Sequence, residues 1–393
     1  MSFFMAARAA LVCKKHLVGL AAALGAVVFG SFLISCSGSK QVPTFGQHQN
    51  AYVTLPGQNS VLYMQINSIT GEMTSIGQTP QILGNSPKGL ALLNKFLYVA
   101  NSAANTVSLF NIANDGSLSQ NGAPTTAGSG PYQVVVDPSG KYLLVTNSLS
   151  NNVSVFSIDS GSGALTEVAG SPFFANIDPG EILIAPTGDL VYVSNSGVGT
   201  VTAFTFSNST GTLTPVPGSP YYSGAGASGL AIDSTGEHLY VANSTAVNNP
   251  PTSIGNLSGF NINLTAGANY GALSAITGSP FVQIAGSEPT ALVFSANGNF
   301  LFATTPGGVY SVWAFSIDSG TGALTPTINS PFSVTAGNLF AIIDSAGGGF
   351  FYIGSPTGIQ GYTYDQNTGQ PTIINHSPFA TGGTAPGKMV ISP

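Results

Sequence analysis

The chain has 393 residues, of which 43% are apolar and only 6% are charged, against roughly a quarter in an ordinary soluble domain. After residue 36 it carries five lysines, no arginine and all 14 acidic residues. So apolar a chain is not a disordered tail, and without arginine it is a poor candidate for binding nucleic acid or phosphate.

The first 35 residues have the pattern of an export signal. A short basic stretch precedes an uncharged apolar run at 17–35, which is long enough to cross a bilayer. The run ends in Leu33-Ile34-Ser35-Cys36, which resembles the bacterial lipobox, whose cysteine is acylated after cleavage. We therefore expect a signal peptide at 1–35, lipid on Cys36 and a flexible tether over 36–50. The alternative is an uncleaved membrane anchor.

These features predict an exported bacterial protein held in the cell envelope by lipid alone, at the periplasmic face or the outer membrane. Several acyl chains on one cysteine are enough for stable attachment. Because Cys13 lies in the leader and Cys36 takes lipid, the exported domain keeps no thiol for a disulfide or a metal site. We expect no metal and no cofactor.

From residue 51 onward, one alternating tetrad recurs seven times. The repeats are aligned on Tyr52, Tyr98, Leu144, Tyr192, Tyr240, Phe302 and Tyr352, with spacings of 46, 46, 48, 48, 62 and 50 residues. A second alternating segment follows each tetrad, and most repeats then have a glycine-rich turn and a short fourth strand. A connector related to Gly-Ser-Pro-Phe leads into the next repeat. We expect the asparagines that end several tetrads to bond the loop that follows them.

Four strands per repeat, seven times, predict an all-β, seven-bladed β-propeller. No window shows a sustained helical period. The first repeat lacks an inner strand, and residues 387–393 match that missing strand. The C-terminal strand should therefore join the first blade and close the ring, which makes 51–393 one domain. We expect a monomer.

The repeated pattern YVAN, NTVSVFSID, GTGALT and GSPF resembles the YVTN-type propellers and the wider seven-bladed lactonase-like family, to which propeller-type 6-phosphogluconolactonases belong. The resemblance covers roughly residues 51–393 and implies this fold. It also implies a histidine after a connector proline, an Arg-His pair in the next connector and a glutamate after a tetrad asparagine. These positions hold Tyr132, Gly180-Glu181 and Ser196. The family's catalytic residues are therefore not matched.

The residues that enter the seven inner strands should gather at the mouth of the central channel. This alignment brings together a small polar set: Lys88, Tyr132, Gln133, Asp178, Glu181, Glu288 and Lys388. A carboxylate facing lysines across a narrow opening suits a polar small molecule, or a general base if burial raises its pKa. The alternative is that these are solvated rim residues.

The fifth repeat departs from the others by a longer loop at 244–256, which contains Pro250-Pro251. By strand direction this loop lies on the same face as the channel mouth. Loops that break a repeat are often functional, and a tolerated insertion is the other interpretation.

Two functions remain open. The first is a non-catalytic binding or scaffolding module whose partner is a small polar ligand or an envelope protein or glycan; surface adhesion differs only in partner size. The alternative is hydrolysis of a carbohydrate lactone, with Glu181 as base and Lys88 or Lys388 stabilising the oxyanion.

Overall fold

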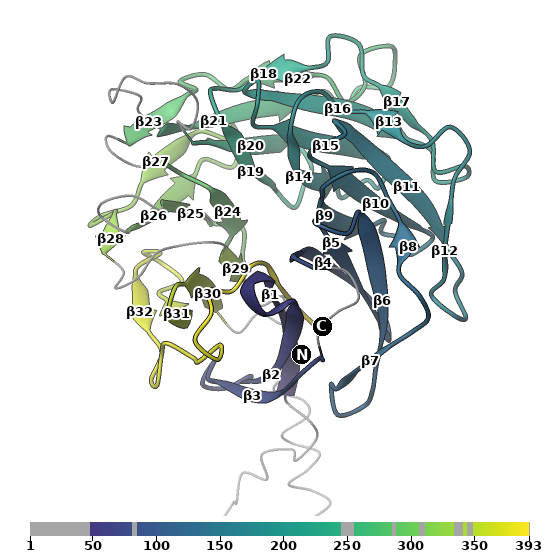
Figure 1. Ribbon diagram of the computed structural model, residues 1–393. Helices are drawn as coiled ribbons and strands as arrows, with labels where there is room; N and C mark the ends of the chain where they lie inside the picture. Colours follow the sequence, from purple (N-terminus) through teal and green to yellow (C-terminus); the bar gives the residue numbers. More distant parts are fainter. Residues whose placement is uncertain are drawn as a thin grey trace, which may run out of the picture. The chain divides into compact units, whose positions relative to one another are not determined.

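The computed structural model describes residues 48–80, 85–244, 255–284, 288–305, 311–333, 341–343 and 349–392. These residues form seven antiparallel sheets arranged as the blades of a β-propeller (Figure 1). Besides strands they contain one 3-10 turn, η1 (Pro56–Gln58), and no helix that is long and apolar enough to span a bilayer. The predicted all-β, seven-bladed fold is confirmed.

Two strands of each blade lie nearest the centre of the ring. The innermost, strand A, is β4 (Pro87–Leu93), β9 (Pro131–Val136), β14 (Pro179–Ile184), β19 (Ala227–Ile232), β24 (Ala291–Phe294), β29 (Ala341–Ile343) or β33 (Met389–Ile391). Strand B contains the tetrad and is β1 (His48–Leu55), β5 (Phe96–Asn101), β10 (Tyr142–Asn147), β15 (Leu190–Asn195), β20 (His238–Asn243), β25 (Phe300–Thr305) or β30 (Phe350–Ser355). In the last six of these B strands every residue is buried, because both faces pack against neighbouring blades.

The outer strands follow in chain order. Strand C is β2 (Ser60–Asn67), β6 (Thr106–Ile112), β11 (Asn152–Ile158), β16 (Thr200–Phe206), β21 (Gly255–Ile262), β26 (Ser311–Ile317) or β31 (Gly358–Tyr364). Strand D is β3 (Met73–Gln78), β7 (Leu118–Gln120), β12 (Leu165–Glu167), β17 (Leu213–Pro215), β22 (Leu273–Ala275), β27 (Leu324–Pro326) or β32 (Pro371–Ile373). The second alternating segment of each repeat is thus strand C.

Four strands per blade is an incomplete description of five blades. A further short strand beside D pairs with the start of strand C: β8 (Thr125–Thr126), β13 (Phe173–Phe174), β18 (Tyr221–Tyr222), β23 (Phe281–Ile284) or β28 (Phe332–Ser333). The connector serine bridges the gap between D and this strand. The Val155 amide, for example, donates to the Ser171 hydroxyl at 3.0 Å. Strands this short have no alternation of their own, so the sequence pattern did not reveal them.

The ring closes through the last strand. β33 pairs antiparallel with β1, with Tyr52 opposite Val390, and Figure 1 shows the C-terminus beside β1. The predicted closure is confirmed. β1 begins at His48, three residues before the predicted start of the domain and inside the predicted tether, because residues 48–50 pair with 65–67 of β2.

The first residue of the tetrad joins adjacent blades. Where it is tyrosine, its hydroxyl donates to a glycine carbonyl in the C–D turn of the next blade, as Tyr240 does to Gly322 at 2.7 Å. The other four pairs are Tyr52 with Gly116, Tyr98 with Gly163, Tyr192 with Gly271 and Tyr352 with Gly71. These buried bonds account for the aromatic residue that recurs in the sequence.

The asparagines that end the tetrads were expected to bond the loop that follows them. Instead, their side chains bond strand C of their own blade. The Asn101 amide donates to the Ser108 hydroxyl at 2.9 Å, and that of Asn195 donates to Thr202 at the same distance. The hairpin between strands B and C brings these side chains face to face. The asparagine therefore fixes the B–C pair rather than its loop.

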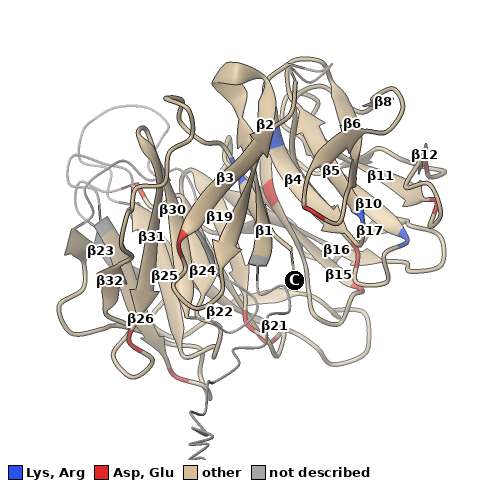
Figure 2. Ribbon diagram, turned by 90° about the horizontal axis from the view of Figure 1, so that it is seen from below, with Lys and Arg blue, Asp and Glu red and all other residues tan. Residues whose placement is uncertain are grey.

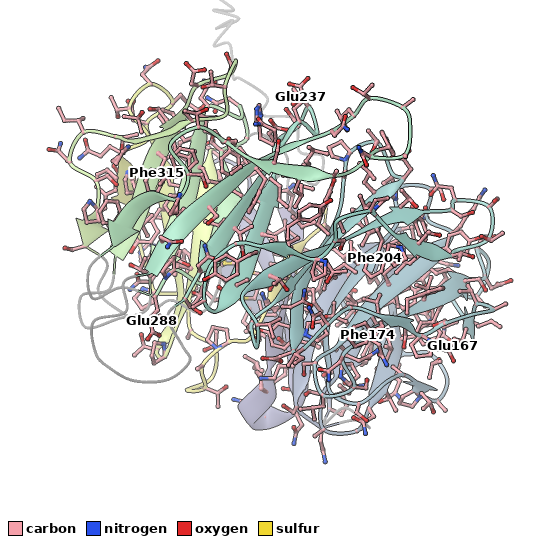
Figure 3. The ribbon with its side chains drawn as sticks, turned by 90° about the horizontal axis from the view of Figure 1, so that it is seen from above. Glu167, Phe174, Phe204, Glu237, Glu288 and Phe315 are labelled. Atoms are coloured by element: carbon pink, nitrogen blue, oxygen red, sulfur yellow. The ribbon has the colours of Figure 1, made fainter. Side chains whose placement is uncertain are left out.

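The blades define two faces. We call the side with the D–A connectors and B–C loops the connector face, and the side with the A–B and C–D turns the turn face. Figure 3 shows Glu237, from an A–B turn, and Glu288, from a connector, on opposite sides. β1 runs from the turn face to the connector face, so the chain enters the propeller at the turn face.

Candidate functional site

A local irregularity at the start of several inner strands positions the polar residues of the mouth. In β14, Pro179 pairs with Asn195 and Ile182 with Val193, so Gly180 and Glu181 together face one residue of β15. The same shift occurs in β4, β9 and β19. Such bulges turn side chains away from the regular alternation, and here they occur at the ring's central opening.

The third residue of the tetrad holds these bulges in place. The Ser194 hydroxyl accepts a bond from the Glu181 amide at 3.0 Å and donates to the carbonyl of Ser228 in the next blade at 2.7 Å. Thr146 and Thr54 act in the same way in their blades. One hydroxyl thus orients a rim residue and links two blades.

The centre of the mouth is an ion pair between blades far apart in sequence. The Lys388 ammonium, directly before β33, donates to Oε1 of Glu181 on β14. The Gln133 amide on β9 donates to Oε2 of the same carboxylate at 3.2 Å. The side chains of Lys388 and Glu181 are only 24% and 16% exposed. Both carboxylate oxygens are therefore already engaged.

The charges at the mouth shift two pKa values. Burial lowers the pKa of Lys388, but the Glu181 carboxylate and Tyr132 outweigh it and hold the pKa above its ordinary 10.5. The Lys388 ammonium, 5.9 Å from the centre of the Tyr132 ring, lowers the pKa of that phenol. Burial and the carboxylates of Glu181 and Asp178 raise it, and the net shift is upward from 10.0. Lys388 therefore stays charged and Tyr132 neutral at physiological pH.

Three cavities meet at this pair, and we call them together the central mouth. The first, about 440 Å³, is lined by Lys88, Tyr132, Lys388 and the segments 56–57 and 384–387. The second, about 220 Å³, is lined by Gln133, Glu181, Lys388, Thr290 and parts of three inner strands. The third, about 370 Å³, is lined by Tyr132, Asp178, Glu181, Ser196 and Lys388 among others.

The structure thus brings together six of the seven predicted residues: Lys88, Tyr132, Gln133, Asp178, Glu181 and Lys388. Glu288 was expected with them, but it is exposed and lines none of the three cavities. It stands two residues before Thr290, as Asp178 stands two residues before Gly180, so the alignment by itself did not separate these two acids. Lys88 has no hydrogen-bond partner for its ammonium among the described residues.

Sequence reasoning passed over the uncharged members of the rim. Ser228 and Thr290 occupy the same alignment position as Lys88 and Tyr132 and line the mouth. Oε1 of Gln133 and Oγ1 of Thr290 are buried and lack partners within the described part of the chain. The repeat alignment would have identified these residues, but only charged and aromatic residues and one glutamine were selected from it.

Several of the other acids and histidines have partners away from the mouth. Asp159 accepts from the Ser162 hydroxyl and from two backbone amides of its own turn, and these bonds lower the pKa of its carboxyl. His238 lies 2.6 Å from Asp233 at the turn face. Figure 2 shows how few positions of the ribbon are charged. Among the described residues, no three His, Cys, Asp or Glu side chains are grouped so as to hold a metal ion.

The leader, Cys36 and most of the long loop of the fifth repeat, residues 245–254, lie outside the described residues. The predictions about them therefore stay predictions.

A seven-bladed propeller with a polar central mouth is thus the class that fold and site define. The family model described as a seven-bladed β-propeller lactonase matches residues 41–174 and 169–259. The chain belongs to this family. A search of curated proteins found no match.

Solved structures show the same fold. A proposed 6-phosphogluconolactonase from Bacteroides fragilis is 20% identical, with a TM-score of 0.70, covering 89% of this chain and 99% of that one. A periplasmic gluconolactonase from Pseudomonas aeruginosa is 16% identical, with a TM-score of 0.66 and coverages of 88% and 99%. A Lactobacillus plantarum protein is 15% identical, with a TM-score of 0.67 and coverages of 83% and 95%.

Proposed function

We propose that the central mouth binds a small polar ligand without hydrolysing it, and that a lipid anchor displays this propeller in the cell envelope. The observation that carries ligand binding is the pair of buried acceptors, Gln133 Oε1 and Thr290 Oγ1, without partners in the described chain. They line one cavity with the Lys388–Glu181 pair. Buried polar atoms are nearly always paired, so a hydroxylated ligand or ordered water would complete them.

The arrangement of Glu181 supports the non-catalytic part of the proposal. A general base needs a free lone pair within reach of the proton it takes. Here Lys388 and Gln133 occupy one carboxylate oxygen each. The positions that should hold the family's catalytic residues do converge, since Tyr132, Gly180, Glu181 and Ser196 line one cavity. They lack its histidine and arginine.

Hydrolysis of a lactone is the second candidate, and family membership favours it. In this mechanism Glu181 leaves Lys388, takes a proton from water, and the hydroxide attacks the lactone carbonyl. Lys388 or Lys88 then stabilises the oxyanion, and the ring oxygen takes the proton back from Glu181 and leaves as the hydroxyl of the acid. A structural neighbour that is a periplasmic gluconolactonase makes sugar lactones the first substrates to test.

One experiment separates the two candidates. The full chain is incubated with glucono-1,5-lactone and galactono-1,4-lactone, and acid release is followed against the spontaneous rate. Binding of the lactones and of the corresponding acids is measured by calorimetry. We expect no rate above background, and binding that Lys388→Met weakens at least tenfold. Turnover that Glu181→Gln abolishes would reject the binding-only proposal.

The lipid anchor has its own test. We expect Cys36→Ala to release the protein from the membrane fraction, and Cys13→Ala to leave it there. Retention of the Cys36→Ala variant in membranes would instead indicate that residues 17–35 stay in place as an uncleaved span.

A further inference from the structure

A second cavity, separate from the central mouth, opens between blades 4 and 5, and we call it the blade 4–5 cavity. Its volume is about 430 Å³, within the range of small-molecule sites. The lining residues come from β18 and the connector after it, the end of β20, one side of β21, the end of β22 and the connector after β22. They are Tyr222, Ser223, Gly224, Ala225, Asn243, Asn256, Ser258, Phe260, Ala275, Ser279 and Pro280.

None of these lining residues is charged. The cavity therefore offers no counter-ion for a phosphate, a carboxylate or an amine. Several of its side chains are nevertheless polar, so a purely apolar ligand would leave amides and hydroxyls unpaired. The ligand that fits both conditions is neutral and rich in hydroxyl groups.

The unpaired polar atoms of the cavity include both an acceptor and a donor, as a hydroxyl group requires. Asn243 is 1% exposed and donates to Ser223, Asn256 and Ser258, which leaves its Oδ1 without a partner among the described residues. Asn256 accepts that bond through Oδ1, and its Nδ2 has no partner in the same part of the chain. An acceptor and a donor are thus available within one cavity. A hydroxyl group can use both, because it donates one bond and accepts others.

An aromatic side chain supplies the remaining element. Tyr222 is 72% exposed at the rim, although its size and ring would favour burial. The electron-rich face of such a ring attracts the partly positive C–H groups on one face of a sugar ring.

The neighbouring junction shows that this cavity is not a property of every repeat. The connector residues Gly224 and Ala225 correspond to Asn176 and Ile177 between blades 3 and 4, which are larger. Ala275 on β22 corresponds to Pro215 on β17, since each pairs with the matching phenylalanine of strand C. The matching asparagines of blades 2, 3 and 4 also have an unpaired Oδ1, so that atom alone does not mark the site. The site is marked by the small connector residues together with Tyr222.

We propose that the blade 4–5 cavity is a binding site for a neutral carbohydrate, with Tyr222 as the stacking platform and Asn243 and Asn256 as the hydrogen-bonding pair. This site goes beyond the proposed ligand of the central mouth and uses none of its residues.

The test is calorimetric titration of the full chain with maltose, cellobiose, lactose and N,N′-diacetylchitobiose. We expect at least one of these disaccharides to saturate the protein. Tyr222→Ala should then weaken binding at least tenfold. The matched control is Phe174→Ala, which removes the equivalent exposed ring, 70% exposed, at the junction of blades 3 and 4. It should leave the affinity within twofold.

A second variant fills the cavity without removing a side chain. Ala225→Ile introduces the residue that stands at the matching position, Ile177, so the local backbone already accepts it one blade earlier. We expect an unchanged melting temperature and at least tenfold weaker binding. The proposal is overturned if no disaccharide saturates, or if Phe174→Ala weakens binding as much as Tyr222→Ala.

Discussion

The central mouth and the blade 4–5 cavity differ in how the fold makes them. The mouth collects side chains from six blades: Lys388, Lys88, Tyr132 with Gln133, Glu181, Ser228 and Thr290. The cavity uses two adjacent blades and no charge. Charged residues in this chain are confined to turns and rims because the blades pack on both faces. The charged site of this protein lies at the central opening of the ring, whereas the uncharged cavity lies beside the small connector between blades 4 and 5.

The largest effect should come from removing the strand that closes the ring. Deleting residues 386–393 removes β33 and Lys388, leaves the edge of β1 unpaired and opens blade 1. We expect a loss of about 5 kcal/mol or more, comparable to the whole stability of a domain, and loss of both sites together. Thermal unfolding followed by circular dichroism measures this, with deletion of residue 393 alone as the control. A truncated protein that melts like the parent would contradict ring closure.

The next effect should fall on the mouth alone. Lys388→Met leaves the Glu181 carboxylate without its counter-ion. Breaking a fully buried pair costs roughly 3–5 kcal/mol, and the partial exposure of this one reduces the expected loss to about 2 kcal/mol. Chemical denaturation measures the change in the free energy of unfolding.

The double variant Lys388→Met with Glu181→Gln is the control for this loss. It should recover at least half of the stability, because no unpaired charge remains. Additive losses would show that the two side chains do not interact. Disaccharide binding at the blade 4–5 cavity should be the same in Lys388→Met, in Glu181→Gln and in the double variant.

A smaller effect should follow from cutting one bond between blades. Tyr240→Phe leaves the buried Gly322 carbonyl without the hydroxyl that donates to it, at an expected cost of about 1–2 kcal/mol. Chemical denaturation measures it. Tyr222→Phe, at an exposed side chain near the cavity, should change stability by less than about 0.5 kcal/mol. Equal losses in the two variants would mean that the interblade bond contributes nothing.

The smallest effect concerns pH. The pKa of Lys388 is raised in the folded protein, so its pairing stabilises the fold fully below the ordinary value of 10.5 and is lost as the pH rises through the shifted value. Stability and ligand binding at the mouth should therefore show no step from Lys388 between pH 6 and 9. Above about pH 10.5 the mouth should lose affinity, while the uncharged blade 4–5 cavity keeps its own. Melting temperature and calorimetry across this range measure both.

Most of the mouth residues were predictable because the seven repeats can be aligned position by position. Once the tetrads are aligned, the residues entering each inner strand fall at equivalent places, and Lys88, Tyr132 and Glu181 can be read off together. Glu288 was expected at the mouth because it aligns with Asp178, but only Asp178 lines one of the three cavities. The uncharged Ser228 and Thr290 were in the same alignment but were not selected.

The blade 4–5 cavity was not predictable from the sequence. Gly224 and Ala225 are ordinary connector residues in a chain with 50 glycines, and nothing local marks them as the lining of a cavity. Their effect depends on which side chains face them from β21 and β22. Alternation in β21 places Asn256, Ser258 and Phe260 on the side that faces the cavity. The residues of blade 4 that complete the lining meet them only when the two sheets pack together.

The sequence by itself determined the number of blades, the strand order and the closure, because each repeat encodes one supersecondary unit and the missing inner strand reappears at the C-terminus. Tertiary structure alone decided that Lys388 meets Glu181 across 207 positions, that bulges lie at the rim of the central opening, and that a cavity forms between blades 4 and 5. The reason is physical. Strand and turn formation are local, whereas an ion pair or a cavity exists only where separate blades come within a few ångströms of each other.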